Sequence, residues 1–194
     1  MYKELLSAAA TILTFIIFFP YIRSIRRGDL KPHVFSWVIW GLGTLIVSFA
    51  QLAGRGGLGA WVIFVSGLIT IYIALLAYFK RGDTAITSTD WIFLGLALCA
   101  LPSWFFSSDP LWAVVTLTFV DIIGFGPTLR KAYAHPYNES VSFFALAAVR
   151  NLLVILALEH YSLTTVLFPA VVGLTCLLLA FMLIYWRSCS RLKQ

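Results

Sequence analysis

The chain has 194 residues, of which 61% are hydrophobic and 11% are charged, and its formal net charge is +6. Soluble domains average about 45–50% apolar and about 25% charged residues. A soluble domain of this length has too little interior to bury so much apolar surface, so the composition excludes a soluble fold. The positive charge does not indicate a nucleic-acid partner, because the basic residues form short clusters between apolar segments, as expected for contact with anionic headgroups and for topology control.

Seven apolar segments predict transmembrane helices, because a helix needs about 20 mostly apolar residues to cross the hydrocarbon core. The segments are continuously apolar and do not alternate with period two, which favours helices over a barrel. We interpret the first as a retained span, since Lys3 is followed by Glu4 and no cleavage pattern comes after it. The predicted fold is therefore an all-α integral membrane protein with seven spans. They are residues 5–21, 34–53, 58–79, 91–107, 111–129, 141–158 and 163–186.

The basic residues predict how the chain is oriented in the membrane. With seven spans, the basic segments after the first, third, fifth and seventh spans all fall on one face, and the other face keeps Lys3 and Arg55. This asymmetry predicts an outside N-terminus and a cytoplasmic C-terminus. A short chain without targeting features suits a bacterial inner membrane. The residues on the basic face are Arg23, Arg26, Arg27, Lys31, Lys80, Arg81, Arg130, Lys131, Arg187, Arg191 and Lys193.

An offset of 107 residues superposes similar landmarks in the two halves of the chain. It pairs Pro20 with Pro127, Arg23 with Arg130, Tyr78 with Tyr185, Phe79 with Trp186 and Lys80 with Arg187, and a single gap also pairs Ser36 with Ser142. The pattern predicts two parallel three-helix repeats, residues 1–82 and 110–187, joined by a linker helix at 83–109 and followed by a tail at 188–194. Parallel repeats are typical of transporters, whose substrate site lies at the repeat interface. The alternative is that aromatic and basic residues recur at every helix end without a repeat.

This three-plus-one-plus-three layout, with a proline near the cytoplasmic end of the first and fifth spans, resembles the PQ-loop superfamily, which includes the SWEET sugar transporters, their half-sized bacterial relatives and the cystine carrier. The resemblance covers essentially the whole chain, but Tyr21 and Thr128 stand where the family usually has glutamine after the proline. It implies alternating access, with Pro20 and Pro127 as hinges of an intracellular gate. The alternative for each proline is that it simply ends a helix at a loop. Transporters of nicotinamide riboside have a similar plan, and Trp37 and Trp40 resemble their tryptophan-rich site.

Asp121 and Arg150 are ionisable residues well inside predicted spans, where a charge costs about 2.5–3.5 kcal/mol or more. Their helices run antiparallel and the two charges have similar depths, so they could form a structural ion pair. Alternatively, Arg150 binds an anionic or hydroxyl-rich substrate, or Asp121 carries a proton. We rank solute binding above proton coupling, because a nearby cation keeps a carboxylate ionised.

Other polar and aromatic residues complete the predicted substrate site. Trp37 and Trp40 share one face of the second span with Thr44, and a flat ring can stack on a sugar, a base or a vitamin ring, or belong to the interfacial belt. Asn151 either lines the cavity or hydrogen-bonds across helices. Glu159 beside His160 is a candidate external gate. The predicted substrate-binding residues are Trp37, Trp40, Thr44, Asp121, Arg150 and Asn151.

The sequence thus predicts a small-solute transporter that works by alternating access and carries a sugar, an amino acid or a vitamin-like solute. The alternative is a seven-helix receptor or sensor that binds a small ligand without flux. No enzyme, cofactor or metal site is predicted, because Cys99, Cys176 and Cys189 are scattered singly and no catalytic motif is present. The expected partners are the solute and the lipid bilayer, and a homo-oligomer is compatible with the pattern.

Overall fold

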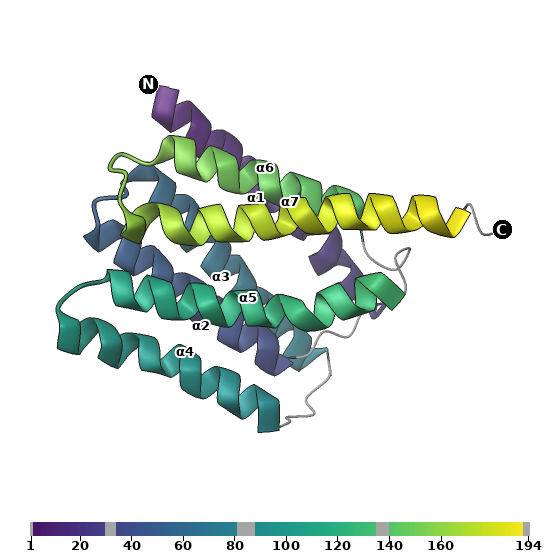
Figure 1. The fold of residues 1–194 in the computed structure, drawn as a ribbon, viewed down its shortest axis with the longest axis horizontal. Helices are drawn as coiled ribbons and strands as arrows, with labels where there is room; N and C mark the ends of the chain where they lie inside the picture. Colours follow the sequence, from purple (N-terminus) through teal and green to yellow (C-terminus); the bar gives the residue numbers. More distant parts are fainter. Residues whose placement is uncertain (1, 30–33, 81–87, 135–139, 192–194) are drawn as a thin grey trace.

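The computed structural model describes residues 2–29, 34–80, 88–134 and 140–191, and these residues form seven α-helices (Figure 1). Glycine, proline and serine mark several of the connections: Gly28 and Gly57 have positive φ angles after α1 and before α3, and the Ser140 hydroxyl accepts a hydrogen bond from the backbone N–H of Phe143. The helices are α1 (Tyr2–Arg27), α2 (Val34–Ala53), α3 (Leu58–Phe79), α4 (Ser88–Ser107), α5 (Leu111–Ala134), α6 (Val141–Ala157) and α7 (Leu163–Arg191).

The predicted elements agree with these helices in number and order, and the bounds of α2 and α3 are the predicted ones. The first, fourth, fifth and seventh helices are longer than predicted, and the sixth ends one residue earlier. α1 continues past Pro20 to Arg27, and α5 continues past Pro127 to Ala134. The alternative that each proline ends its helix is therefore wrong, because both prolines lie inside helices.

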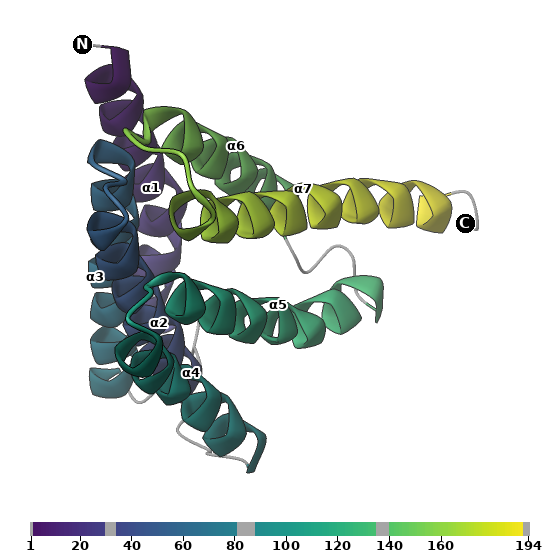
Figure 2. The ribbon, with the colours of Figure 1, turned by 60° about the vertical axis from the view of Figure 1, so that its left-hand side comes forward.

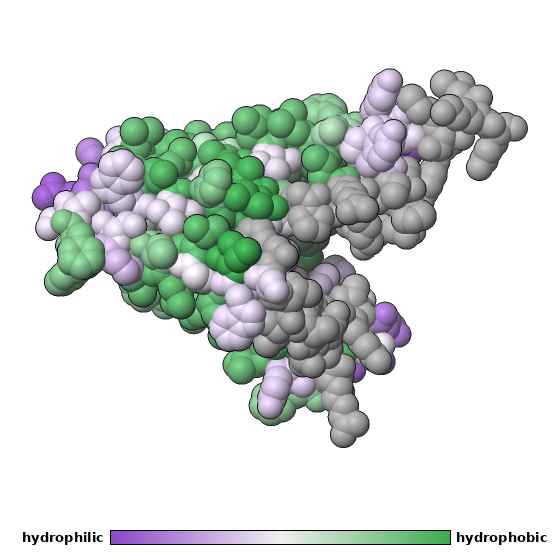
Figure 3. Space-filling view, turned by 60° about the horizontal axis from the view of Figure 1, so that its bottom comes forward, coloured by the Kyte–Doolittle hydropathy of each residue, from purple (hydrophilic) through white to green (hydrophobic). Residues whose placement is uncertain are grey.

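The surface of the bundle is apolar along most of its length. Four helices are long and apolar enough to cross a membrane, namely α1, α2, α3 and the greater part of α7, and α4, α5 and α6 contain shorter apolar stretches. Large apolar side chains point outward, with Phe79, Phe105 and Phe106 at least three-quarters exposed. Figure 3 shows hydrophobic residues over the middle of one face and hydrophilic residues towards its ends. Such a surface is suited to lipid, so the chain is a membrane-embedded helical protein.

For description we name α1–α3 the first group of helices and α5–α7 the second, in chain order, and α4 lies beside them. α3 packs against both α1 and α2, and α7 packs against both α5 and α6. Between the groups, α1 contacts α6, α2 contacts α5 and α7, and α3 contacts α6, while α4 packs on α5 and α2. The buried core between α2, α3 and α5 is built from small and branched side chains such as Val47, Ile63, Val114 and Leu117.

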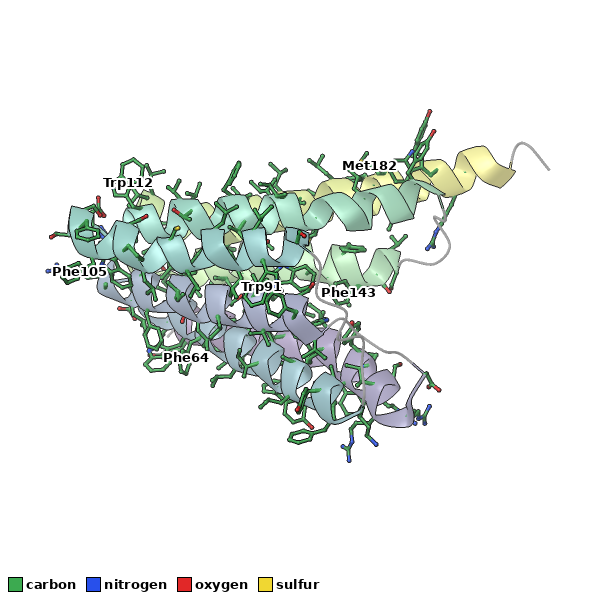
Figure 4. All side chains as sticks on the ribbon, turned by 90° about the horizontal axis from the view of Figure 1, so that it is seen from below. Phe64, Trp91, Phe105, Trp112, Phe143 and Met182 are labelled. Carbon is green, nitrogen blue, oxygen red and sulfur yellow. The ribbon has the colours of Figure 1, made fainter. Side chains whose placement is uncertain are left out.

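The two groups of helices converge at one end and diverge at the other. Residues 54–57, 108–110 and 158–162 connect the helices at one end of the bundle, which we name the short-loop end (Figure 1). Towards the opposite end, which carries the C-terminus, α5 and α7 separate from α1, α2 and α3 (Figure 2). Labelled aromatic side chains Phe64, Phe105 and Trp112 surround the short-loop end in Figure 4.

Hydrogen bonds fasten the two groups together at the short-loop end, and we name this set the clasp. Each bond joins the α1–α3 group to the α6–α7 turn or to the start of α7. The ammonium of Lys3 also lies 5.6 Å from the centre of the Tyr161 ring. The clasp consists of Lys3 Nζ donating to Leu158 O (2.7 Å), Gln51 Nε2 donating to Thr165 O (2.8 Å) and Glu159 N donating to Gly56 O (3.1 Å).

The close approach of α3 to α6 below the clasp depends on Gly59. A Cβ atom at this position would lie 2.7 Å from the carbonyl oxygen of Val154 and 3.0 Å from the backbone nitrogen of Leu158. We predict that Gly59→Ala lowers the free energy of unfolding by about 1–3 kcal/mol, because backbone atoms of α6 must move aside. Thermal unfolding of the purified protein in detergent measures the effect.

Gly95 provides the matched control, since a Cβ atom there would meet nothing within 4 Å. Gly95→Ala should leave the melting temperature unchanged or raise it, because alanine favours a helix by about 1 kcal/mol over glycine. Equal melting temperatures for the two variants would contradict the predicted role of Gly59.

Candidate functional site

A pocket lies between α2, α5 and the first turns of α7. Its cavity volume is about 10 Å³, room for roughly one water molecule and far below the roughly 300–1,000 Å³ of pockets that hold drug-sized ligands. A larger molecule can therefore enter only when the three helices separate further. The lining residues are Ile39, Trp40, Gly43, Thr44, Leu117, Val120, Asp121 and Phe168.

The polar groups of this pocket are among the predicted substrate-binding residues. The structure brings together Trp40 and Thr44 of α2 with Asp121 of α5. Within the described part of the chain, neither the Thr44 hydroxyl nor the Asp121 carboxylate makes a hydrogen bond or an ion pair. The indole of Trp40 packs against Gly124, where a Cβ atom would lie only 3.1 Å from Trp40 Nε1. The pocket thus presents an aromatic ring, a hydroxyl and a carboxylate to its interior.

Arg150 lies at a different interface, between α6 and α1. Its Nε donates to the hydroxyl of Thr14 over 3.1 Å, and its Nη1 donates to Oδ1 of Asn151 over 3.4 Å. The side chain is only 8% exposed, and its Nη2 has no hydrogen-bond partner among the described residues. No ion pair joins Arg150 to Asp121, although the structure describes both. The interpretation of these two charges as a structural ion pair is therefore wrong for this conformation.

Asn151 and Trp37 lie outside the pocket. The amide of Asn151 donates to the carbonyl of Ala147 in its own helix and accepts from Arg150, so it supports the arginine from within α6. The ring of Trp37 lies 4.9 Å from that of Tyr21 and 5.7 Å from that of Trp40, measured between centroids. These rings form an aromatic series that leads from the pocket to the diverging end of the bundle.

The predicted gate prolines lie away from these polar groups. Pro20 is exposed on the surface of α1, and Pro127 lies in α5, although its side chain is outside the described part. Glu159, a candidate external gate, takes part in the clasp through its backbone, and the carbonyl of its neighbour His160 accepts a hydrogen bond from the Thr165 hydroxyl over 2.8 Å.

The structure reveals polar residues near these sites that the sequence analysis missed. Thr14 is fully buried and binds Arg150, and the buried hydroxyl of Thr118 on α5 has no partner among the described residues. Cys176 of α7 is buried in a cluster with residues of α5 and α6. Gln51 and Thr165 form part of the clasp. A threonine or glutamine inside an apolar segment carries little signal on its own, because it can bond its own helix.

The 107-residue offset between the two halves of the sequence could have pointed to Thr14 as a residue of interest. The offset of 107 that pairs Pro20 with Pro127 also pairs Thr14 with Asp121, and the gap that pairs Ser36 with Ser142 pairs Thr44 with Arg150. The α1–α6 interface therefore carries a threonine and a cation, and the α2–α5 interface carries a threonine and an anion at matching positions.

No protein-family model matches the chain, and comparison with curated proteins and with solved structures found no match either. The fold and the site themselves define the class: an all-helical, membrane-embedded protein with unpaired polar groups inside the bundle.

Thr14 and Thr44 differ in their hydrogen bonds, which gives a prediction. Thr14→Val removes the acceptor of Arg150 Nε and leaves a buried charged donor unpaired, so we expect a loss of about 1–3 kcal/mol of stability. Thr44→Val, the same substitution at the α2–α5 interface, removes no hydrogen bond within the described chain and should leave stability almost unchanged. Thermal unfolding in detergent compares the two. A loss of equal size in both variants would show that the Thr14–Arg150 bond contributes nothing specific.

Proposed function

We propose that the protein is a small-solute membrane transporter that works by alternating access. One combined observation carries this proposal. The two helix groups diverge at one end of the bundle but not at the other, and the pocket between them contains polar groups without a partner among the described residues. A pore would need a continuous polar path, whereas these groups are fastened together at the short-loop end. Closing one end while the other is open is the geometry that alternating access requires.

The proposed architecture is seven spans in two parallel three-helix repeats, with α4 as the linker. The helix contacts support it, because exchanging α1 with α5, α2 with α6 and α3 with α7 converts each main contact between two of these six helices into another such contact. For example, α1 on α6 becomes α5 on α2, and α3 on α6 becomes α7 on α2. α4 has contacts without a counterpart, as expected for a linker. The resemblance of this layout and its two prolines to the PQ-loop superfamily supports the same proposal.

The charge distribution supports an inward-facing orientation for this conformation. Basic residues at the end of α1 and just after α3, among them Arg26, Arg27 and Lys80, are exposed at the diverging end. The positive-inside rule assigns such an end to the cytoplasm. The clasp then closes the outer side, and the pocket with Trp40 and Asp121 is reached from the cytoplasmic side along the aromatic series.

The transport cycle follows from these elements. A solute enters between the two helix groups, stacks on the Trp40 ring and bonds to Thr44 and Asp121. The groups then close at the cytoplasmic end, with Pro20 and Pro127 providing helix positions that lack a backbone hydrogen bond and can bend. Opening the outer end breaks the bonds of Lys3, Gln51 and Glu159, which are few and lie near the membrane surface.

The direct test is solute flux into proteoliposomes containing the purified protein, with a panel of labelled sugars, amino acids, nucleosides and vitamins. We expect at least one class to accumulate by counterflow, and Trp40→Ala to reduce its rate at least tenfold. Trp61→Ala is the matched control, because Trp61 faces outward from α3 and is 51% exposed. Specific binding without flux would instead identify a receptor, and flux unaffected by Trp40→Ala would place the solute elsewhere.

The seven-span orientation makes a separate prediction. In a variant whose native cysteines are replaced, Arg55→Cys and Asp109→Cys should react with a membrane-impermeant thiol reagent from outside the cell. Lys80→Cys should react only after the membrane is opened. All three positions are exposed in the structure, so access depends on the membrane alone. Labelling of residues 55 and 109 from opposite sides would contradict seven spans.

A further inference from the structure

Two opposite charges in the bundle lack a partner of opposite sign. Asp121 lines the pocket without a hydrogen bond or ion pair, and Arg150 is 8% exposed with Nη2 unbonded, within the residues that the structure describes. Each charge costs several kcal/mol in a membrane interior unless it is compensated. The two charges do not form an ion pair with each other in this conformation. A ligand that pairs with both would therefore bind with a large gain in free energy.

The surroundings of Asp121 favour a cationic group on that ligand. Its carboxylate shares the pocket with the indole of Trp40, and a cation next to both gains an ion pair and a cation–π contact. The hydroxyl of Thr44 adds an acceptor for a further N–H. The other residues that line the pocket are apolar, so the pocket contains no positively charged side chain that could bind an anionic ligand group.

The surroundings of Arg150 favour a carboxylate. Thr14 and Asn151 hold Nε and Nη1, which fixes the plane of the guanidinium and leaves Nη2 to donate. The unbonded Nη2 can donate a charge-assisted hydrogen bond to a carboxylate oxygen, and the described residues supply no acidic side chain to it.

α7 reaches both charged groups. Its Phe168 lines the pocket with Asp121, and a Cβ atom at its Gly173 would lie 3.0 Å from Cβ of Asn151, the neighbour of Arg150. A solute between the two halves could therefore be reached by both charges as the two helix groups close, and a zwitterion would neutralise both at once. A sugar or a nucleoside would leave both charges bare.

We infer that the transported solute is a zwitterion of the amino-acid class, whose carboxylate binds Arg150 and whose ammonium binds Asp121 beside Trp40. The inference rests on the proposed transport function and names its substrate class. It also explains why the two charges are kept apart here, since a direct ion pair would remove the binding groups.

The test compares three ligands that share one side chain: a neutral amino acid, the amine that lacks its carboxylate and the acid that lacks its ammonium. Binding is measured by thermal shift and flux by counterflow in proteoliposomes. For the wild type we expect each single-charge analogue to bind at least tenfold more weakly than the amino acid. This pattern requires no variant, so it stands even if a substitution impairs folding.

Variants then assign each charge to its residue. Arg150→Gln should abolish the preference for the amino acid over the amine and keep the preference for the amino acid over the acid. Asp121→Asn should abolish the preference for the amino acid over the acid and keep the preference over the amine. Arg23→Gln, at an exposed position on α1, should change neither preference. Equal loss of both preferences in both variants would overturn the assignment of the two groups.

The outcomes separate the inference from the transport proposal. Flux of a sugar, nucleoside or other uncharged solute that is independent of Arg150 and Asp121 would overturn the inference of a zwitterionic solute and would keep the proposal that the protein is a transporter. Binding of the amino acid with no flux would keep the binding assignment and overturn transport. An absence of binding and flux for every solute in the panel would overturn both.

Discussion

Hydrocarbon offers no hydrogen bonds, so every polar group that this chain carries into the bundle has to be satisfied by the protein or by what the protein binds. Arg150 shows the constraint most clearly. Thr14 and Asn151 bond two of its nitrogens, and the third remains unbonded although the side chain is almost fully buried. Asp121 has no such support, and it is tolerated because it opens into the pocket. The packing of α1 on α6 and of α2 on α5 thereby determines which polar group is bound and which is available.

The same constraint makes the two ends of the bundle differ in how tightly the helix groups are joined. At the short-loop end, the clasp consists of hydrogen bonds between charged or amide side chains and backbone groups of the other half. Gly59 adds a close backbone contact just below it. At the diverging end, the helices α5 and α7 extend away from α1–α3 (Figure 2), and exposed aromatic and basic residues there are suited to the interface and to headgroups. A bundle fastened at one end and separated at the other can exchange these states without unfolding a helix.

The helices could be predicted from the sequence because hydropathy alone determines them: continuous apolar segments of about 20 residues have few alternatives to a helix in lipid. The pocket was predicted in part, since Trp40, Thr44 and Asp121 do come together. The partners of Arg150 could not be predicted from depth alone. Two residues at equal depth meet only if their helices present them to the same interface, and the described contacts place Arg150 towards α1 rather than towards Asp121. Thr14 carries no signal by itself and becomes informative only through the 107-residue offset.

The account depends on the two helix groups moving relative to each other, and one distance reports on that movement. Tyr78 of α3 and Tyr185 of α7 are matched by the offset and are both exposed towards the diverging end. Spin labels at these positions, in a variant without native cysteines and reconstituted in lipid, would be measured by pulsed electron paramagnetic resonance. The account predicts two distances, the longer one matching this structure and the shorter one gaining population when a transported solute is added. A single distance that no solute changes would contradict it.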